Sequence, residues 1–188
     1  MKKSMDRNTL RKIFDFIEEK ERKTSLAYKI LNDFDNIRDN ELIVNGNLKL
    51  SNKNITSLPE GLQVEGSLYL SRCTSLTSLP VRLQVGGSLG LSRCTSLTSL
   101  PDGLQVEGDL SLSRCINLTS LPEGLQVEGD LYLTGCTNLT SLPEGLQVGG
   151  DLFVANTPLA KYTDGDVFLE MIGSNGYIKG IIKRSWRG

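Results

Sequence analysis

Leucine and valine recur along most of the chain at positions that repeat every 21 residues. One unit shows the full set: Leu68, Leu70, Leu76, Leu79, Leu83 and Val85. The tripeptide Ser-Leu-Pro keeps the same period and occurs at 57–59, 78–80, 99–101, 120–122 and 141–143. Residues 67–71 alternate between polar and apolar side chains, which is typical of a half-buried strand. The proline and the glycine-containing segment after it favour an extended, turning chain.

A unit of this length cannot bury its own leucines, so the units must stack one on the next. In such a stack the parallel strands lie about 4.8 Å apart, and the leucines of successive units meet. We therefore predict a solenoid with one continuous leucine core. Its strands form a curved parallel sheet.

The segment Val64–Leu76 reads VEGSLYLSRCTSL. It resembles the leucine-rich repeat signature L-x-x-L-x-L-x-x-(N/C)-x-x-L. The short period and the LPxxL element are similar to the repeats of bacterial type III effectors and of short leucine-rich proteins of phages and prophages. The resemblance covers about Leu42 to Leu159. It implies a leucine-rich-repeat solenoid with a horseshoe-shaped sheet, an extended, polyproline-like convex side, and a binding role.

The chain divides into three predicted regions. Residues 1–41 form an N-terminal helical cap, 42–162 contain about six repeat units, and 163–188 form a C-terminal cap with a basic tail. Residues 6–22 have apolar side chains at helical spacing, and residues 25–36 predict a second helix with Ser25 as its N-cap. Near the other end we expect a short helix through Ile172 and a final strand at 177–182. The first helix and the tail around Trp186 are alternative partner-binding segments.

Each of the four internal units carries one cysteine at the same place: Cys73, Cys94, Cys115 and Cys136. We align Asn52 and Asn156 of the terminal units with this position, where the family places an inward Asn or Cys. A site that accepts either residue is a packing position. Stacked thiols have parallel Cβ vectors and do not converge on one point, which disfavours a disulfide or a metal site. We predict buried, reduced, structural cysteines.

Outward side chains of the predicted strands form the concave face, where the sequence varies most. The central column is Lys49, Tyr69, Gly90, Ser111, Tyr132 and Phe153, and beside it stand Ser67, Ser88, Asp109, Asp130 and Asp151. A third column, Arg72, Arg93 and Arg114, ends at Gly135. Aromatic residues and arginine are common binding hot spots, and Gly90 with Ser111 would leave a saddle between Tyr69 and Tyr132.

The candidate partner-binding residues are Tyr69, Tyr132, Phe153, Ser88, Ser111, Asp109, Asp130, Asp151, Arg72, Arg93 and Arg114. Each set also has a simpler interpretation. Tyrosine and phenylalanine favour strands in general. A row of arginines also keeps an edge soluble.

The sequence contains no histidine, and its formal net charge is −1. Without histidine neither a Cys–His pair nor a Ser–His–Asp group can be assembled. Aspartates in one repeated environment also lack the distinct pKa values that acid–base catalysis needs. We expect no enzymatic activity, no cofactor and no metal. No apolar run reaches the roughly 20 residues of a membrane helix, and the first residues lack a signal-peptide core, so we expect a cytoplasmic protein.

These patterns predict a non-enzymatic module that binds another protein through its concave face. The resemblance implies a host protein that is inhibited or redirected. One alternative is a nucleic-acid-directed role, in which the arginines and basic ends contact phosphates or the acidic edge mimics them; the near-neutral charge disfavours it. A second alternative is a self-associating structural module, so the chain is expected to be a monomer or a homodimer.

Overall fold

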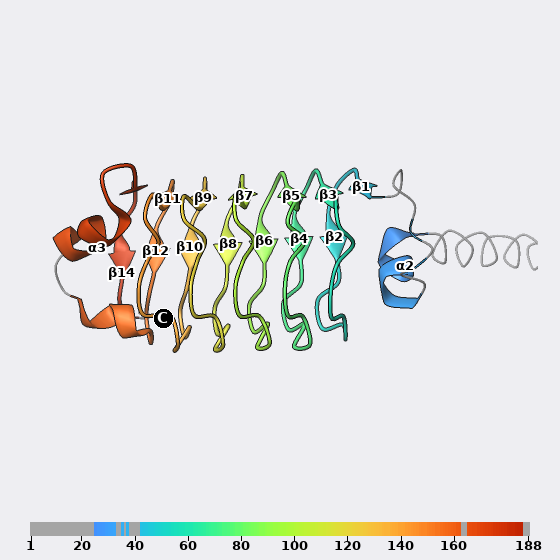
Figure 1. Ribbon diagram of the computed structural model, residues 1–188, viewed down its shortest axis with the longest axis horizontal. Helices are drawn as coiled ribbons and strands as arrows, with labels where there is room; N and C mark the ends of the chain where they lie inside the picture. The colour runs from blue at the N-terminus through green and yellow to red at the C-terminus, as the bar shows by residue number, and fades with distance from the viewer. Residues whose placement is uncertain (1–24, 33–34, 36, 38–41, 163–164, 186–188) are drawn as a thin grey trace, which may run out of the picture.

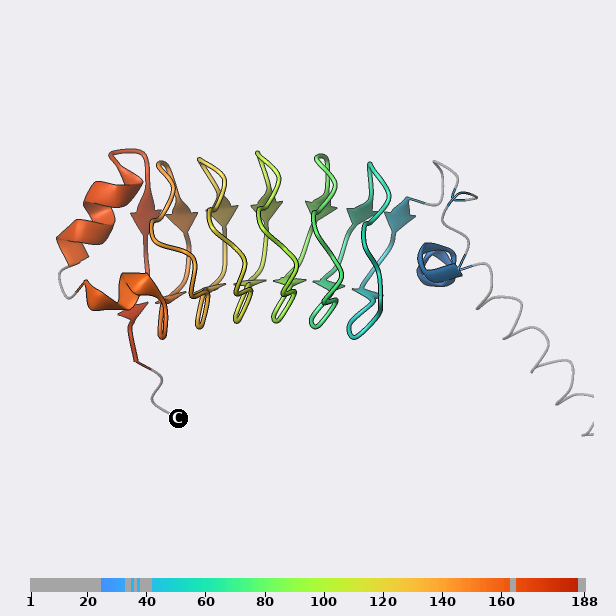
Figure 2. The same cartoon turned by 60° about the horizontal axis from the view of Figure 1, so that its bottom comes forward.

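The repeat region winds into a row of similar coils (Figure 1). The structure, a computed structural model, describes residues 25–32, 35, 37, 42–162 and 165–185. Helix α2 (Leu26–Asn32) lies at one end of the row and helix α3 (Gly165–Ile172) at the other. The predicted solenoid is confirmed. The row is nearly straight in both views (Figures 1 and 2) and lacks the curve of the predicted horseshoe, so each sheet has an outward face rather than a concave or convex one.

Each coil contributes two strands of two residues to two separate parallel sheets, which form two lines of arrows in Figure 2. Sheet A contains β1 (Ile43–Val44), β3 (Gln63–Val64), β5 (Gln84–Val85), β7 (Gln105–Val106), β9 (Gln126–Val127), β11 (Gln147–Val148) and β13 (Tyr177–Ile178). Sheet B contains β2 (Leu48–Lys49), β4 (Leu68–Tyr69), β6 (Leu89–Gly90), β8 (Leu110–Ser111), β10 (Leu131–Tyr132), β12 (Leu152–Phe153) and β14 (Ile182–Lys183).

Sheet A corrects the prediction of an extended convex side, because the Gln-Val segments of that side form strands. Val64 pairs with Val85 of the next coil and is 1% exposed, whereas Gln63 points to solvent. The backbone amide of Glu65 donates to Val44 O of the preceding coil at 3.0 Å. Each unit therefore satisfies two stretches of its backbone through neighbouring coils, which fixes the stacking register on two sides.

The core is one continuous cluster of inward side chains along the row. Within one coil, Leu68 and Leu70 of the sheet B segment and Leu76 beyond the turn are all 0% exposed. The same positions are buried in the coils on either side, as the 21-residue period requires. Burying a leucine contributes about 1.5–3 kcal/mol, so the stacked leucines supply most of the drive to fold.

The chain outside the repeats adds to both ends of this core. Ser25 Oγ accepts the Tyr28 N–H at 3.2 Å, which confirms the predicted N-cap, and α2 buries Ile30 against the cluster. At the other end α3 buries Phe168 and Ile172 completely. The predicted final strand is two strands, because β13 joins sheet A and β14 joins sheet B. The predicted helix at 6–22 and the tail at 186–188 lie outside the described residues.

Candidate functional site

The four cysteines form an inward row in which every residue is 0% exposed: Cys73, Cys94, Cys115 and Cys136. All are free thiols, and each S–H donates to a leucine carbonyl of the preceding coil, as Cys94 does to Leu70 O at 3.2 Å. Burial raises the pKa of both Cys94 and Cys115 to about 12. Such thiols stay protonated at neutral pH and are poor nucleophiles. The prediction of buried, unpaired cysteines is confirmed.

The residue before each cysteine occupies a tight turn with a positive backbone φ. In the turn from Leu70 to Cys73, the Cys73 N–H donates to Leu70 O at 3.0 Å and Arg72 has φ of 63°. Turns with a positive φ at the third residue prefer glycine or asparagine. Asn52 (φ 61°) and Asn156 (φ 56°) occupy this position in the terminal units.

The predicted alignment of the two asparagines with the cysteines is therefore wrong. The backbone N–H of Asn52 donates to Ser71 O at 2.8 Å, just as the backbone N–H of Arg72 donates to Ser92 O one coil later. In the last unit the cysteine position is taken by Thr157, whose Oγ1 donates to a backbone carbonyl at 2.6 Å. Asparagine occurs in the turn because its short polar side chain tolerates the left-handed conformation.

A second row lies at the corner between the two sheets, and we call it the corner row: Ser67, Ser88, Asp109, Asp130 and Asp151. Each side chain accepts the backbone N–H of the residue that follows it in the stack. Asp130 N–H donates to Asp109 Oδ1 at 2.9 Å, and Asp151 N–H donates to Asp130 Oδ1 at 2.8 Å. The same kind of hydrogen bond precedes the row, where the Ser67 N–H donates to Asn47 Oδ1 at 2.7 Å, and closes it, where the Ile181 N–H donates to Asp151 Oδ1 at 2.9 Å.

This geometry gives the corner row a structural role that the sequence analysis did not recognise. A coil bends at the corner between its two strands, so the amide there has no carbonyl partner in a regular ladder. A side-chain oxygen from the coil before satisfies it. Ser88, Asp109, Asp130 and Asp151 were predicted to bind a partner, and the structure shows that each directs one oxygen into the stack.

The central column of sheet B is arranged as predicted. Parallel pairing places Tyr69 beside Gly90, Gly90 beside Ser111, Ser111 beside Tyr132 and Tyr132 beside Phe153. The rings of Tyr132 and Phe153 stack with centroids 4.4 Å apart and planes inclined by 14°. Tyr69 is 37% exposed and borders a hollow of about 410 Å³ with Lys49 and Ser51. The column therefore presents aromatic surface to solvent at two places.

A hydrogen bond to Tyr132 and a lysine ammonium over Phe153 hold the stacked pair in place. The Tyr132 hydroxyl donates to Asp130 Oδ2 at 2.9 Å, and burial together with this carboxylate raises the pKa of Tyr132 to about 12. Lys183 Nζ lies 4.5 Å from the centroid of Phe153 and forms an ion pair with Asp151 at 2.5 Å. The ammonium of Lys183 and the Ile181 amide hold the pKa of Asp151 below its ordinary value. The sequence analysis missed Lys183 because it lies after the last recognisable unit.

Three arginines, which we call the arginine row, each lie three residues after the end of a strand of sheet B: Arg72, Arg93 and Arg114. Their φ angles are 63°, 63° and 62°. The left-handed conformation costs a non-glycine residue about 1 kcal/mol, more than it costs asparagine or glycine. The equivalent residue of the next coil is Gly135, with φ of 78°. Together with Thr74, Thr95 and Ile116, the arginines line a groove of about 570 Å³.

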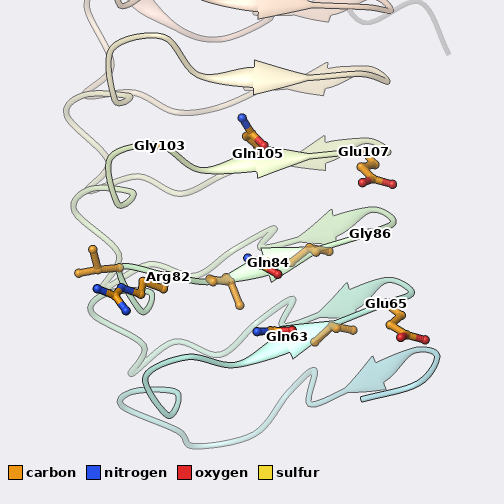
Figure 3. Close-up of a pocket in the computed structure, with 12 residues that line it drawn as sticks. Gln63, Glu65, Arg82, Gln84, Gly86, Gly103, Gln105 and Glu107 are labelled. Atoms are coloured by element: carbon orange, nitrogen blue, oxygen red, sulfur yellow. The ribbon is translucent and has the colours of Figure 1, made fainter. Parts of the chain in front are cut away.

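The outward face of sheet A carries a different cavity, of about 460 Å³ (Figure 3). Three glutamine side chains from neighbouring strands lie along it: Gln63, Gln84 and Gln105. Glu65 and Glu107 flank the cavity on one side, with Gly86 between them. Arg82 stands on the other side, where other coils have glycine. These polar side chains offer no pair of groups in distinct environments, so we assign the cavity no reaction.

No metal-binding cluster of His, Cys, Asp or Glu is present among the described residues. None of the described helices is long and apolar enough to cross a membrane. Comparison with family models, with curated proteins and with solved structures finds no match. The surface of the chain itself therefore provides the evidence on its function.

Proposed function

We propose that this chain is a non-enzymatic binding module of the leucine-rich-repeat kind, which recognises another protein through the outward face of sheet B. The observation that carries the proposal is the stacked pair of Tyr132 and Phe153 on that face. An aromatic pair on a rigid support presents a large contact area at little cost in side-chain entropy, and such residues dominate protein interfaces.

Two further features support this face. Tyr69 and the hollow beside it lie on the same sheet as the stacked pair, three strands away from Tyr132. Between them Gly90 and Ser111 have small side chains, so this part of the face projects less far than the aromatic rings on either side. A protruding partner loop or helix fits this relief. The resemblance to effector and phage repeats extends the proposal to a host protein as the partner.

The test is capture of partners from a cell lysate by tagged protein, read by mass spectrometry. The test variant is Tyr69→Ala/Tyr132→Ala/Phe153→Ala. The matched control is Gln84→Ala/Gln105→Ala/Gln126→Ala, which truncates the same number of side chains on sheet A. Both variants are first confirmed to be folded by circular dichroism.

We expect the native chain and the control to capture a protein that the aromatic variant loses. Capture of one and the same set by all three proteins would refute the outward face of sheet B as the site. Light scattering across protein concentration is measured in parallel. A mass that doubles with concentration in the native chain, and not in the aromatic variant, would show that this face binds a second copy of the chain instead.

A further inference from the structure

We propose that the arginine groove, formed by Arg72, Arg93 and Arg114 with Thr74, Thr95 and Ile116, binds an extended acidic segment of the partner protein. This inference rests on the proposed function and names the chemistry of the partner. It concerns an edge of the face that the aromatic residues do not reach.

The three arginines lie on strained backbone with a positive φ. The turn repeats in six coils, and three of them use asparagine or glycine: Asn52, Gly135 and Asn156. These residues show what the turn alone prefers. The three consecutive coils in between carry arginine at φ near 63°. Because strained residues persist where they have a function, three successive arginines at this position indicate a role beyond folding.

These arginines also have no anionic partner among the described residues. The ion pair found among the described residues is the one between Lys183 and Asp151. Each guanidinium has five N–H donors in a planar fork that matches a carboxylate with two parallel hydrogen bonds. The backbones of successive coils lie about 4.8 Å apart, so the exposed arginines repel one another mildly, and a bound anion would reduce this repulsion.

The lining of the groove indicates what else the ligand carries. Thr74 and Thr95 line the groove in two coils. The third coil has Ile116 at the same position, and this side chain is 42% exposed. An isoleucine at this place is unfavourable for solubility and favourable for an apolar contact. At the same end the row stops at Gly135, where an added Cβ would lie 3.1 Å from Cγ of Arg114. The groove therefore suits a chain with carboxylates and at least one apolar side chain.

The charge of the surroundings decides between a protein segment and a nucleic acid. Residues 25–176 contain 9 basic and 17 acidic residues, a balance of −8 that repels a long polyanion. The groove has no aromatic side chain on which a base could stack. A short acidic peptide presents its few charges only to the arginines. We therefore infer an acidic peptide segment as the occupant.

The experiment measures fluorescence anisotropy of a short labelled peptide, Glu-Glu-Leu-Glu-Glu-Leu. A Gln-Gln-Leu peptide and a single-stranded DNA oligonucleotide serve as comparison probes. The test variant is Arg72→Asn/Arg93→Asn/Arg114→Asn, which places in each turn the residue found at positions 52 and 156. The control, Arg82→Gln/Lys161→Gln/Lys179→Gln, removes the same three positive charges elsewhere. A variant with lysine at the three arginine positions keeps the charge and loses the fork.

We expect the Glu-Glu-Leu peptide to bind the native chain in preference to both comparison probes. The asparagine variant should lose at least tenfold in affinity, the lysine variant less, and the control no more than about twofold. Binding should weaken as salt rises. Equal losses in the asparagine variant and the control would show nonspecific attraction and overturn the inference, as would tighter binding of the DNA.

A further arm separates this inference from the proposed function. The variant Tyr69→Ala/Tyr132→Ala/Phe153→Ala should still bind the acidic peptide, because those residues do not line the groove. If this variant loses the peptide and the asparagine variant keeps it, the inference fails and the proposed function stands. If the asparagine variant loses the peptide while the aromatic variant captures the native set of partners, the groove is a site and the aromatic face is not.

Discussion

The corner row, with its three aspartates, and the arginine row both repeat from coil to coil and both border sheet B, yet they differ in the contacts that they make. In the corner row each aspartate accepts a backbone N–H of the next coil, as Asp109 does from Asp130 at 2.9 Å. In the arginine row the guanidinium groups make no such contact among the described residues, and the backbone that carries them is strained at φ near 63°. One row lowers the free energy of the stack, and the other raises it.

The difference teaches how to separate structural from functional repeats in a solenoid. A repeated side chain that satisfies a backbone group of its neighbour needs no ligand to explain it. The cysteine row belongs to this kind, since each S–H donates to a leucine carbonyl. A repeated side chain that costs stability and has no partner in the stack is a candidate for binding. The predictions below test this distinction.

The largest expected effect concerns the cysteine row. Burial raises the pKa of Cys94 and Cys115 from 9.0 to about 12, so at pH 8 the fraction of thiolate is about a thousandfold lower than in an ordinary cysteine. Labelling of Cys94 and Cys115 by a maleimide in the native state should be slower by about that factor, and all four thiols should react once urea unfolds the chain. Rapid labelling without denaturant would contradict the inward position.

The corner row gives a smaller effect that is measured as stability. Asp130→Ala removes the acceptor of the Asp151 N–H and of the Tyr132 hydroxyl, and should lower the free energy of unfolding by about 1–2 kcal/mol. Asp130→Asn keeps an oxygen acceptor and should cost less than half as much. Urea unfolding curves of the two variants provide the measurement. Equal costs would mean that charge, rather than the hydrogen bond to the backbone, is what matters at this position.

The arginine row should respond in the opposite direction. Arg93→Asn replaces a strained residue by one that tolerates a positive φ, so the free energy of unfolding should rise by about 0.5 kcal/mol. Lys53→Asn changes the same charge at a residue without a positive φ and is the control. Urea unfolding with several replicates resolves a change of this size. A clear loss of stability in Arg93→Asn would indicate that the arginine side chain supports the stack.

The smallest effect is a pH dependence at Asp151. The Lys183 ammonium and the Ile181 amide lower the pKa of Asp151 in the folded chain. A lowered folded pKa means that this contribution is complete above the ordinary value of 3.8 and is lost as the pH falls through the folded value. Asp151→Asn should therefore flatten the fall in stability below about pH 4 relative to the native chain. Thermal unfolding between pH 5 and 2 compares the two, and identical slopes would contradict the assigned pairing.

The periodicity of the leucines was enough to predict the stack and the outward column of sheet B. A fixed period forces equivalent residues into register, so Tyr132 and Phe153 had to be neighbours once the units stacked. Sheet A was not predicted, although Leu62–Glu65 alternates between apolar and polar residues, because the proline and glycine just before this segment favoured an unpaired, turning chain. Its backbone bonds come from the stacking itself.

The turn and the corner row escaped prediction for a different reason. Asparagine suits either a packed corner or a turn with positive φ, so the sequence left the alignment of Asn52 ambiguous by one residue. The turn geometry resolves it. Likewise, an aspartate in a strand-flanking position is usually solvated. Only the bend between the two sheets, which brings the Asp130 amide to Asp109 Oδ1, reveals the hydrogen bond.

The hydrogen bonds of the corner row join successive coils, and we propose that the arginine row binds a ligand. Urea unfolding and binding of the Glu-Glu-Leu peptide, measured on the same two proteins, Asp130→Ala and Arg72→Asn/Arg93→Asn/Arg114→Asn, separate these two roles. We expect opposite results from the two variants. Asp130→Ala should lose stability and keep peptide binding, whereas the arginine variant should keep or gain stability and lose peptide binding. Loss of stability in the arginine variant with peptide binding retained would contradict the account.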